Sequence, residues 1–198
     1  MRLLRAVLRA AMRSRERLPD TTWPTLLQLA SLLPGELPVI GAPSATRVLV
    51  VAPHPDDETI GCGGTLALLA DAGADVRVVV ATDGEATIGS PHTPEATAAR
   101  RRREAVEACA ILGVGAPVFL GLRDGGLAEH GAALASGIAA VHDALDPQLV
   151  LTPWPLDRHP DHRRCAAAVG DVVDDTTEVW GYEAHVPLTP TRTVDVSA

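Results

Sequence analysis

Short apolar runs rich in β-branched residues alternate along the chain with longer segments whose apolar residues recur every three or four positions. The first pattern predicts buried β-strands, and the second predicts amphipathic helices. Strands are expected at 47–52, 75–82, 117–122, 149–152, 178–183 and 193–196, and helices at 59–73, 94–112, 132–145 and 163–173. This alternation predicts an α/β fold: a Rossmann-like, doubly wound, mainly parallel sheet with helices on both faces.

The first of these strands runs into an unusual turn, A-P-H-P-D-D-E, at residues 52–58. Proline fixes its own φ and removes a hydrogen-bond donor, so the prolines on either side of His54 place this segment in the turn that leaves the strand. In open α/β sheets ligands bind at such turns. The carboxylates of Asp56, Asp57 and Glu58 would repel one another without a positive partner. We therefore expect a divalent cation here.

The strand at 149–152 leads into a second turn of the same kind, which carries H-P-D-H at residues 159–162. Zn²⁺ favours imidazole and carboxylate ligands, and a catalytic site keeps three protein ligands and one open position. His54 and Asp57 with one histidine of the second motif would form such a set. The two turns therefore predict a shared zinc site.

Together, A-P-H-P-D-D-E and H-P-D-H resemble the zinc-dependent de-N-acetylases of the PIG-L or LmbE-like family. The resemblance covers about residues 47–196, including the order of strands and helices. Members of that family act on N-acetylglucosamine-containing glycolipids, on mycothiol and bacillithiol precursors and on some antibiotics. The resemblance implies a hydrolase with Zn²⁺ as cofactor that removes an N-acetyl group from an N-acetylglucosamine-type sugar or glycoconjugate.

The resemblance also implies a role for each polar residue of the two motifs. The implied zinc ligands are His54, Asp57 and His162. Asp56 would be the general base that takes a proton from water. His159 would face the reacting carbonyl, stabilise the oxyanion and protonate the departing amine, with Asp161 as its orienting partner.

Three further residues are candidates for contact with the substrate. Arg101 matches the family pattern R-x-x-E with Glu104, although a surface Arg–Glu pair explains that spacing equally well. Asp124 resembles the residue that accepts a substrate hydroxyl, and a turn-forming Asp-Gly pair is the alternative. Trp154 would either stack on a sugar face or pack over the end of its strand.

Other features qualify the resemblance. Glu58 would either brace the metal ligands or favour the N-terminus of the following helix. Members that cleave mycothiol or its precursor have a tyrosine two residues before H-P-D-H, where Asp157 stands here, so a mycothiol role is less expected. Family members usually continue beyond the last predicted strand, so we expect a domain that is short at its C-terminus.

The N-terminal segment differs from the rest in charge. Residues 1–17 contain six arginines and one glutamate, with the arginines at helical spacing, which predicts a basic amphipathic helix. Such a helix would pack on its own domain or on a neighbouring subunit of a homo-oligomer. The alternative is peripheral contact with an anionic membrane surface. We expect residues 1–45 to form an extension and residues 46–198 to form the deacetylase domain.

The remainder of the chain carries eleven arginines against twenty-four acidic residues, a formal charge of −13, which argues against a nucleic-acid partner. No apolar run is long enough to predict a transmembrane segment. The three distant cysteines, Cys62, Cys109 and Cys165, form no C-x-x-C pair, so we expect buried thiols and a cytoplasmic protein.

Glycines at 61, 63 and 64 lie inside a predicted helix. A dinucleotide-binding fingerprint needs its first glycine in the turn, so we expect these glycines to allow close packing of the helix on the sheet. Two other functions compete with deacetylation. One is an amidase that cleaves a larger amide conjugate with the same residues, and the other is a catalytically weak family member that acts mainly by docking.

Overall fold

A computed structural model describes residues 38–184 and 191–197 of the chain. The predicted basic helix at 1–17 lies outside the described residues. Within them, no helix has the length and apolar character that a membrane span requires.

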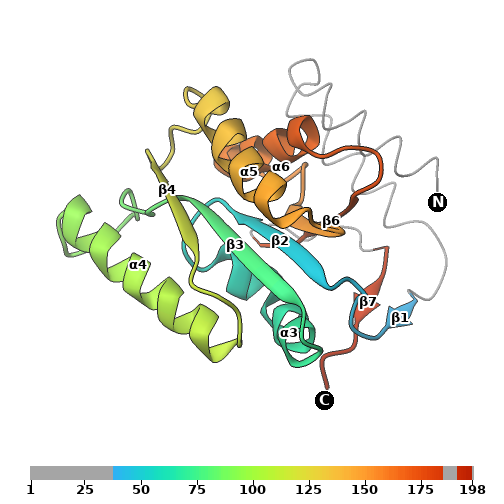
Figure 1. Ribbon diagram of the computed structural model, residues 1–198. Helices are drawn as coiled ribbons and strands as arrows, with labels where there is room; N and C mark the ends of the chain where they lie inside the picture. The colour runs from blue at the N-terminus through green and yellow to red at the C-terminus, as the bar shows by residue number, and fades with distance from the viewer. Residues whose placement is uncertain (1–37, 185–190, 198) are drawn as a thin grey trace, which may run out of the picture.

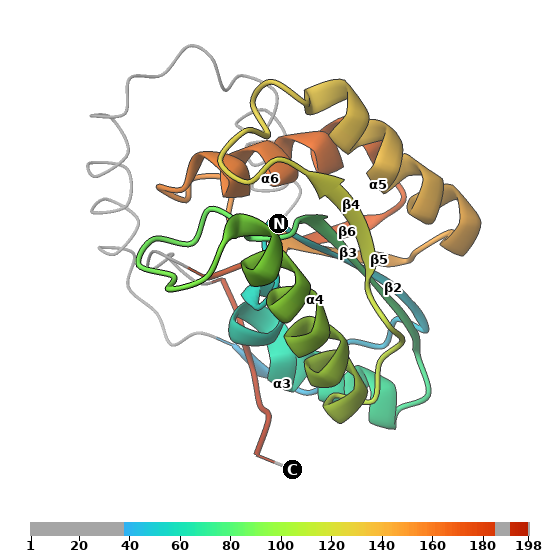
Figure 2. The ribbon, with the colours of Figure 1, turned by 90° about the vertical axis from the view of Figure 1, so that its left-hand side faces the viewer.

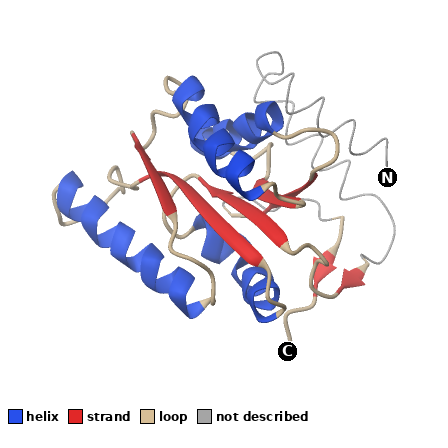
Figure 3. Cartoon of the chain, viewed as in Figure 1, coloured by secondary structure: helices blue, strands red, loops and turns tan. Residues whose placement is uncertain are grey.

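Five parallel strands form the central sheet (Figures 1 and 3). Their bounds are β2 Arg47–Ala52, β3 Asp75–Thr82, β4 Val118–Leu122, β5 Leu149–Pro153 and β6 Glu178–Tyr182. The spatial order is β4-β3-β2-β5-β6. The predicted parallel α/β sheet is therefore confirmed.

Helices cover both faces of this sheet, as Figure 2 shows from the side. They are α3 Asp57–Asp71, α4 Pro94–Ile111, α5 Gly131–Leu145 and α6 Pro160–Val172. Alternate residues of β2 point to opposite faces because the side-chain period of a strand is two. Val48 packs in one core cluster with Leu66 of α3, and Leu49 packs in the other with Ile138 of α5. The doubly wound arrangement is confirmed.

A second, two-stranded ladder joins the two ends of the described chain. β1 Val39–Ile40 pairs in parallel with β7 Thr193–Val194. The sequence predicted the later strand, although over a longer range, and did not predict the earlier one. Two residues are too few to show a hydrophobic period, so β1 can be recognised only from its pairing.

Three helices begin earlier than the sequence predicted: α5 by one residue, α3 by two and α6 by three. Helix α3 begins at Asp57 and α6 at Pro160, so both motifs continue into the first turn of a helix. The prolines suggested a longer turn, but Pro160 is itself the first residue of α6, a position that suits proline because an amide hydrogen there would have no partner in the helix. Before α3 the nearest proline is Pro55, and the helix begins two residues after it, with Asp56 as its N-cap. The last residues of both motifs therefore lie in the first turn of a helix, and the hydrogen-bonded helical backbone fixes their positions.

The strand order changes direction at the centre of the sheet. From β2 the chain moves outward through β3 and β4, and then returns to place β5 on the other side of β2. The register pairs Val48 with Leu149 and Val50 with Leu151. In sheets of this type ligands bind beside such a switch point, at the carboxyl ends of the strands. Both sequence motifs leave the sheet at this point.

Two of the three glycines of α3, Gly61 and Gly64, allow the close packing that was predicted, whereas a Cβ atom on Gly63 would meet no atom closer than 3.7 Å. A Cβ atom on Gly61 would lie 2.2 Å from the ring of Tyr182, and one on Gly64 would lie 2.9 Å from Val196. Only glycine lets the helix approach β6 this closely. The three cysteines are free thiols; Cys109 and Cys165 are buried, and Cys62 is partly exposed.

Candidate metal centre

The two motifs meet in space as the sequence predicted. The imidazole centroid of His54 lies 4.8 Å from that of His159 and 5.5 Å from that of His162, and the last two are 5.0 Å apart. The rings come from turns about a hundred residues apart in sequence. The neighbouring positions of β2 and β5 bring them together.

Asp57 lies between two of these rings. Its Oδ2 atom is 3.1 Å from Nδ1 of His54 and 3.2 Å from Nε2 of His162, and it also accepts the backbone N–H of His54 at 3.1 Å. All three residues are less than 10% exposed. Two imidazoles and a carboxylate that converge in this way form a donor set suited to a divalent transition metal.

The far side of each ring also faces carboxylates. Nε2 of His54 is 3.1 Å from Oδ1 of Asp124 and 3.4 Å from Oδ2 of Asp161. Nδ1 of His162 is 3.3 Å from Oδ2 of Asp157. Metal-bound histidines in proteins commonly donate their other ring N–H to a carboxylate, which fixes the ring and its tautomer. The surroundings of both rings fit that pattern.

The carboxylates make this site favourable for positive charge. Burial by itself lowers the pKa of His54, but its hydrogen bonds with Asp124, Asp161 and Asp57 raise that pKa to about 11. Burial also opposes the charge on His162, whose hydrogen bonds with Asp157 and Asp57 raise its pKa to about 9. A histidine binds metal only as the neutral imidazole, so a bound metal ion would replace the protons on these rings. The ion would then supply the positive charge that the surrounding carboxylates favour.

The carboxylate of Asp57 responds in the opposite direction. Burial favours its neutral form, but the hydrogen bonds with His162 and His54 outweigh burial and bring its pKa below the ordinary range. Asp57 therefore remains an anionic donor at neutral pH.

The cluster offers other groupings of donors as well. Within the described residues, His54, His159 and His162 present ligand atoms within 4.8 Å of one another, and so do His54, Asp124 and Asp161. His54 belongs to both groups. The site is therefore built around His54, the first residue of the first motif with a metal-binding side chain.

Asp56 differs from its neighbour Asp57 in both exposure and backbone. Its side chain is 55% exposed, and it caps α3 with φ of 111°, a left-handed conformation that is uncommon outside glycine. Its N–H donates to Oε2 of Glu58 at 3.2 Å. Glu58 is fully buried, and this burial raises its pKa. Glu58 thus contacts the backbone of Asp56 and also lies in the first turn of α3, so both of its predicted roles stay predictions.

Arg101 reaches this turn from α4. It donates to Oδ2 of Asp56 at 2.8 Å, to the carbonyl of Pro55 at 2.6 Å and to the hydroxyl of Thr87 at 2.6 Å. Its neighbour Arg100, rather than Arg101, pairs with Glu104 on the surface. Arg101 is thus directed into the site, and its contact with substrate stays a prediction.

His159 caps the N-terminus of α6. Its Nδ1 accepts the backbone N–H of Asp161 at 3.2 Å. A neutral imidazole that accepts at Nδ1 carries its proton on Nε2. The carboxylate of Asp161 accepts the amides of Gly125 and Leu127 at 2.8 and 3.2 Å and approaches His54. Its predicted orienting effect on the His159 ring stays a prediction.

Asp124 and Trp154 are less open to a ligand than the sequence suggested. Asp124 divides its carboxylate between His54 and the amide of Ala86, which it accepts at 3.0 Å. Trp154 packs its ring against Gly181 of β6, as the structural alternative proposed. Contact of either side chain with substrate stays a prediction.

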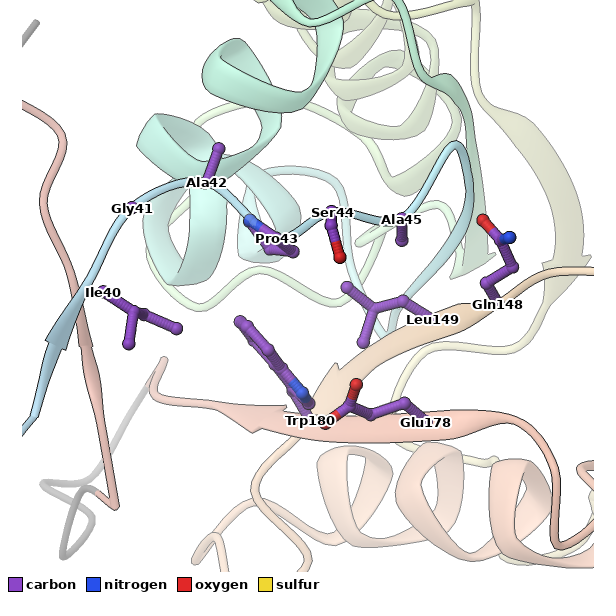
Figure 4. A pocket seen from close by; sticks show the side chains of 10 residues that line it. All are labelled: Ile40, Gly41, Ala42, Pro43, Ser44, Ala45, Gln148, Leu149, Glu178 and Trp180. Atoms are coloured by element: carbon purple, nitrogen blue, oxygen red, sulfur yellow. The ribbon is translucent and has the colours of Figure 1, made fainter.

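A separate cavity of about 430 Å³ lies near the amino-terminal ends of β5 and β6, away from the strand ends that carry the two motifs (Figure 4). It is lined by the segment 40–45 and by side chains at the amino ends of β5 and β6, including Leu149 and Trp180. Because the motifs leave the carboxyl ends of the strands, this cavity is not part of the candidate metal centre.

Sequence reasoning missed three supporting residues. Asp157 was noted only as a departure from a family pattern, yet it is 1% exposed and contacts His162. Glu85 accepts the backbone N–H of Asp124 at 2.8 Å, and Thr87 accepts from Arg101. The acidic turn after β3 was the only signal for Glu85. Thr87 and Arg101 lie on different elements, and Asp157 reaches His162 across the start of α6, a contact that no spacing rule gives.

Comparison with known proteins agrees with this geometry. Residues 49–173 match the PIG-L family, described as GlcNAc-PI de-N-acetylase. The match covers more than half of the chain and contains both motifs. The chain belongs to the PIG-L family.

Similar proteins of the family are named as deacetylases. A 1D-myo-inositol 2-acetamido-2-deoxy-alpha-D-glucopyranoside deacetylase of Mycobacterium sp. (strain KMS) is 40% identical over 142 residues, which cover 59% of this chain and 46% of that protein. A probable N-acetyl-alpha-D-glucosaminyl L-malate deacetylase 2 of Bacillus subtilis is 36% identical over 129 residues, or 62% of this chain and 58% of that protein. The chain spans about half the length of these curated relatives.

Solved structures share the fold. An N,N'-diacetylchitobiose deacetylase from Pyrococcus horikoshii is 31% identical with a TM-score of 0.60, and the match covers 78% of this chain and 58% of that one. A 4-carboxy-2-hydroxymuconate hydratase from Pseudomonas putida is 26% identical with a TM-score of 0.52, covering 62% and 55%. Because proteins with different activities share this fold, the reaction has to be argued from the site.

Proposed function

We propose that this chain is a zinc-dependent hydrolase that removes the N-acetyl group from an N-acetylglucosamine-type sugar or glycoconjugate. The observation that carries the proposal is the position of Asp57, within 3.1 and 3.2 Å of imidazole nitrogens from two separate strand ends. The names of the relatives, all deacetylases of acetylated amino sugars, favour an acetyl group over a larger acyl group.

The proposed zinc ligands are His54, Asp57 and His162. Bonds of about 2.0 to 2.1 Å in a tetrahedral site hold ligand atoms about 3.3 Å apart. The two distances from Oδ2 of Asp57 to the imidazoles, 3.1 and 3.2 Å, are close to that value. Both contacts of Asp57, with their imidazole and carboxylate donors, are therefore compatible with a zinc ion. When bound, zinc polarises the amide carbonyl and lowers the pKa of water to about 7.

Asp56 is the proposed general base. It lies in the turn between His54 and the proposed ligand Asp57. Of the two neighbouring aspartates, the carboxylate of Asp56 is exposed and that of Asp57 is buried. Arg101 holds one carboxylate oxygen at 2.8 Å, which limits the movement of the side chain. An ionised, accessible carboxylate beside the metal ligands can accept a proton from water as it attacks the amide carbon.

His159 is the proposed partner on the other side of the reacting carbonyl. The backbone N–H of Asp161 donates to Nδ1 of His159, so the proton of the neutral His159 ring lies on Nε2. An Nε2–H directed to the carbonyl oxygen would stabilise the negative charge that develops there. The departing amine needs a proton, and the one that Asp56 takes from water is available for it, because a neutral His159 that gave up its Nε2 proton would become an imidazolate. His159 can donate a proton to the amine only in its cationic form, and we propose Asp161 as the residue that orients the ring.

For the substrate we propose contacts with Arg101, Asp124 and Trp154, which lie around the same turns. We further propose residues 46–198 as the deacetylase domain, residues 1–45 as an extension, and the cytoplasm as the compartment.

The proposal is tested by acetate release. The protein is stripped of metal with a chelator, restored with one equivalent of Zn²⁺ and supplied with a panel of N-acetylated amino sugars and their glycosides. We expect acetate to appear with the zinc-restored protein and not with the stripped one. Zinc binding without acetate release from any member of the panel, or release that does not depend on metal, would overturn the proposal.

A further inference from the structure

Asp157 is a buried carboxylate in the turn between β5 and α6. It is 1% exposed. Its Oδ1 atom accepts the backbone N–H of His159 at 2.8 Å, and its Oδ2 atom lies 3.3 Å from Nδ1 of His162. Its own N–H donates to the carbonyl of Trp154 at 3.0 Å. One side chain therefore contacts both histidines of the H-P-D-H motif.

The turn by itself does not require a carboxylate at this position. An acceptor that bonds the backbone N–H two residues later can be supplied by serine, threonine or asparagine. A buried anion is unfavourable unless its oxygens have partners. The second oxygen of Asp157, directed at the His162 ring, is the contact that a simple turn would lack.

That contact favours one of the two tautomers of His162. A carboxylate can only accept, and its negative charge 3.3 Å from Nδ1 favours a proton on that nitrogen over a lone pair. In the neutral ring this leaves the lone pair on Nε2, the atom that lies 3.2 Å from Oδ2 of Asp57. The ring is therefore presented to the proposed metal position in the tautomer that can bind metal.

We propose that Asp157 is a positioning residue that fixes the orientation and tautomer of His162 as a metal ligand. The inference rests on the proposed function, since it concerns the same metal centre. By holding the His159 amide with its other oxygen, Asp157 also keeps the two histidines of the motif in one fixed relation.

The substitution Asp157→Asn separates this role from a role in the turn. If the amide oxygen of asparagine accepts the His159 N–H, its NH₂ group faces Nδ1 of His162 and favours a proton on Nε2, where the metal should bind. If the amide is flipped, its NH₂ group meets the His159 N–H, and two donors face each other. Asp157→Ser is the second variant: its hydroxyl can still accept the His159 N–H, but it is too short to reach His162.

The measurements are the zinc dissociation constant, by competition with a chromogenic chelator, and thermal unfolding of the zinc-stripped protein. We expect both variants to bind zinc about 10 to 100 times more weakly than the wild type, the range typical for loss of such a partner. The control is Asp83→Asn, which makes the same chemical change at a carboxylate that pairs with Arg102. We expect the control to bind zinc as the wild type does.

The outcomes distinguish the inference from the function on which it rests. Zinc affinity of wild-type strength in Asp157→Asn and Asp157→Ser overturns the inference and leaves the hydrolase proposal intact. The inference is also overturned if the stripped variants unfold at lower temperature while the folded fraction binds zinc normally, because that pattern shows only a structural role. Failure of the wild type to bind zinc overturns the hydrolase proposal itself.

Discussion

The substitution Asp56→Asn is the sharpest test of the proposed chemistry. Asp56 has a backbone φ of 111°, and asparagine is among the few residues that tolerate positive φ values. An asparagine oxygen can still accept from Arg101, which now contacts the carboxylate at 2.8 Å. The side chain is largely exposed, so the loss of charge leaves no buried group without a partner. We therefore expect a folded variant that keeps its metal ligands.

The rate is expected to fall steeply, because an amide cannot accept a proton from water. Removal of a positioned general base reduces the rate on the order of 10²- to 10⁴-fold. At about 1.36 kcal/mol for each tenfold change, this corresponds to about 2.7 to 5.4 kcal/mol of transition-state stabilisation. The loss should appear in kcat and in kcat/KM alike, because the proton is transferred only in the reaction and not on binding.

The assay measures acetate release together with zinc content and thermal unfolding. The matched control is Asp143→Asn, an exposed carboxylate on α5 outside the site. We expect the control to retain the parental rate and both variants to retain zinc. An Asp56→Asn protein that is folded, loaded with zinc and as fast as the wild type would refute the assignment of the base.

Three further predictions concern the other parts of the account. Gly61→Ala should lower the free energy of unfolding by about 1 to 3 kcal/mol, because the new Cβ would lie 2.2 Å from the Tyr182 ring. Denaturant unfolding measures this, with Gly131→Ala as the control because no atom lies within 4 Å of its Cβ position. His159→Gln should reduce the rate on the order of 10²- to 10⁴-fold with zinc content unchanged, and loss of zinc in this variant would instead indicate a ligand. Hydrogen bonds from Thr176 and Thr177 lower the pKa of Asp174 to about 2. Because this is below the unfolded value of about 3.9, its contribution to stability is complete above that value and is lost as the pH falls through about 2. Asp174→Ala should therefore be less stable than the wild type at pH 7, and unfolding curves that still differ equally at pH 2 would contradict this.

The strands could be predicted from the sequence because each is a short apolar run between turn residues. The bounds of β2 and β3 agree with the prediction to the residue. The fold class followed from the alternation of strands and helices. The helix start at Pro160 was placed too late because a proline signals a turn and a first helical residue equally well. The start at Asp57 was placed too late because the whole acidic run after Pro55 was assigned to the turn.

The approach of the two motifs could be predicted, but their contacts could not. Each motif follows a buried strand, and parallel strands end at the same edge of a sheet. The pairing of β2 with β5 then brings His162 of the second motif to His54 and Asp57 of the first. The contacts of Arg101 with Asp56 and of Asp157 with His162 depend on side-chain directions that sequence spacing does not determine. Such supporting contacts become visible only when the elements are placed in space.

The measurement that tests the central claim most directly is the zinc content of the wild type, His54→Ala and His162→Ala after dialysis against a limiting concentration of zinc. Because the two histidines come from different strand ends and both approach Asp57, the account predicts one zinc ion per chain in the wild type and loss of that ion in each variant. Circular dichroism verifies that the variants remain folded. Full zinc occupancy in either folded variant would contradict the claim that the two turns share one metal ion.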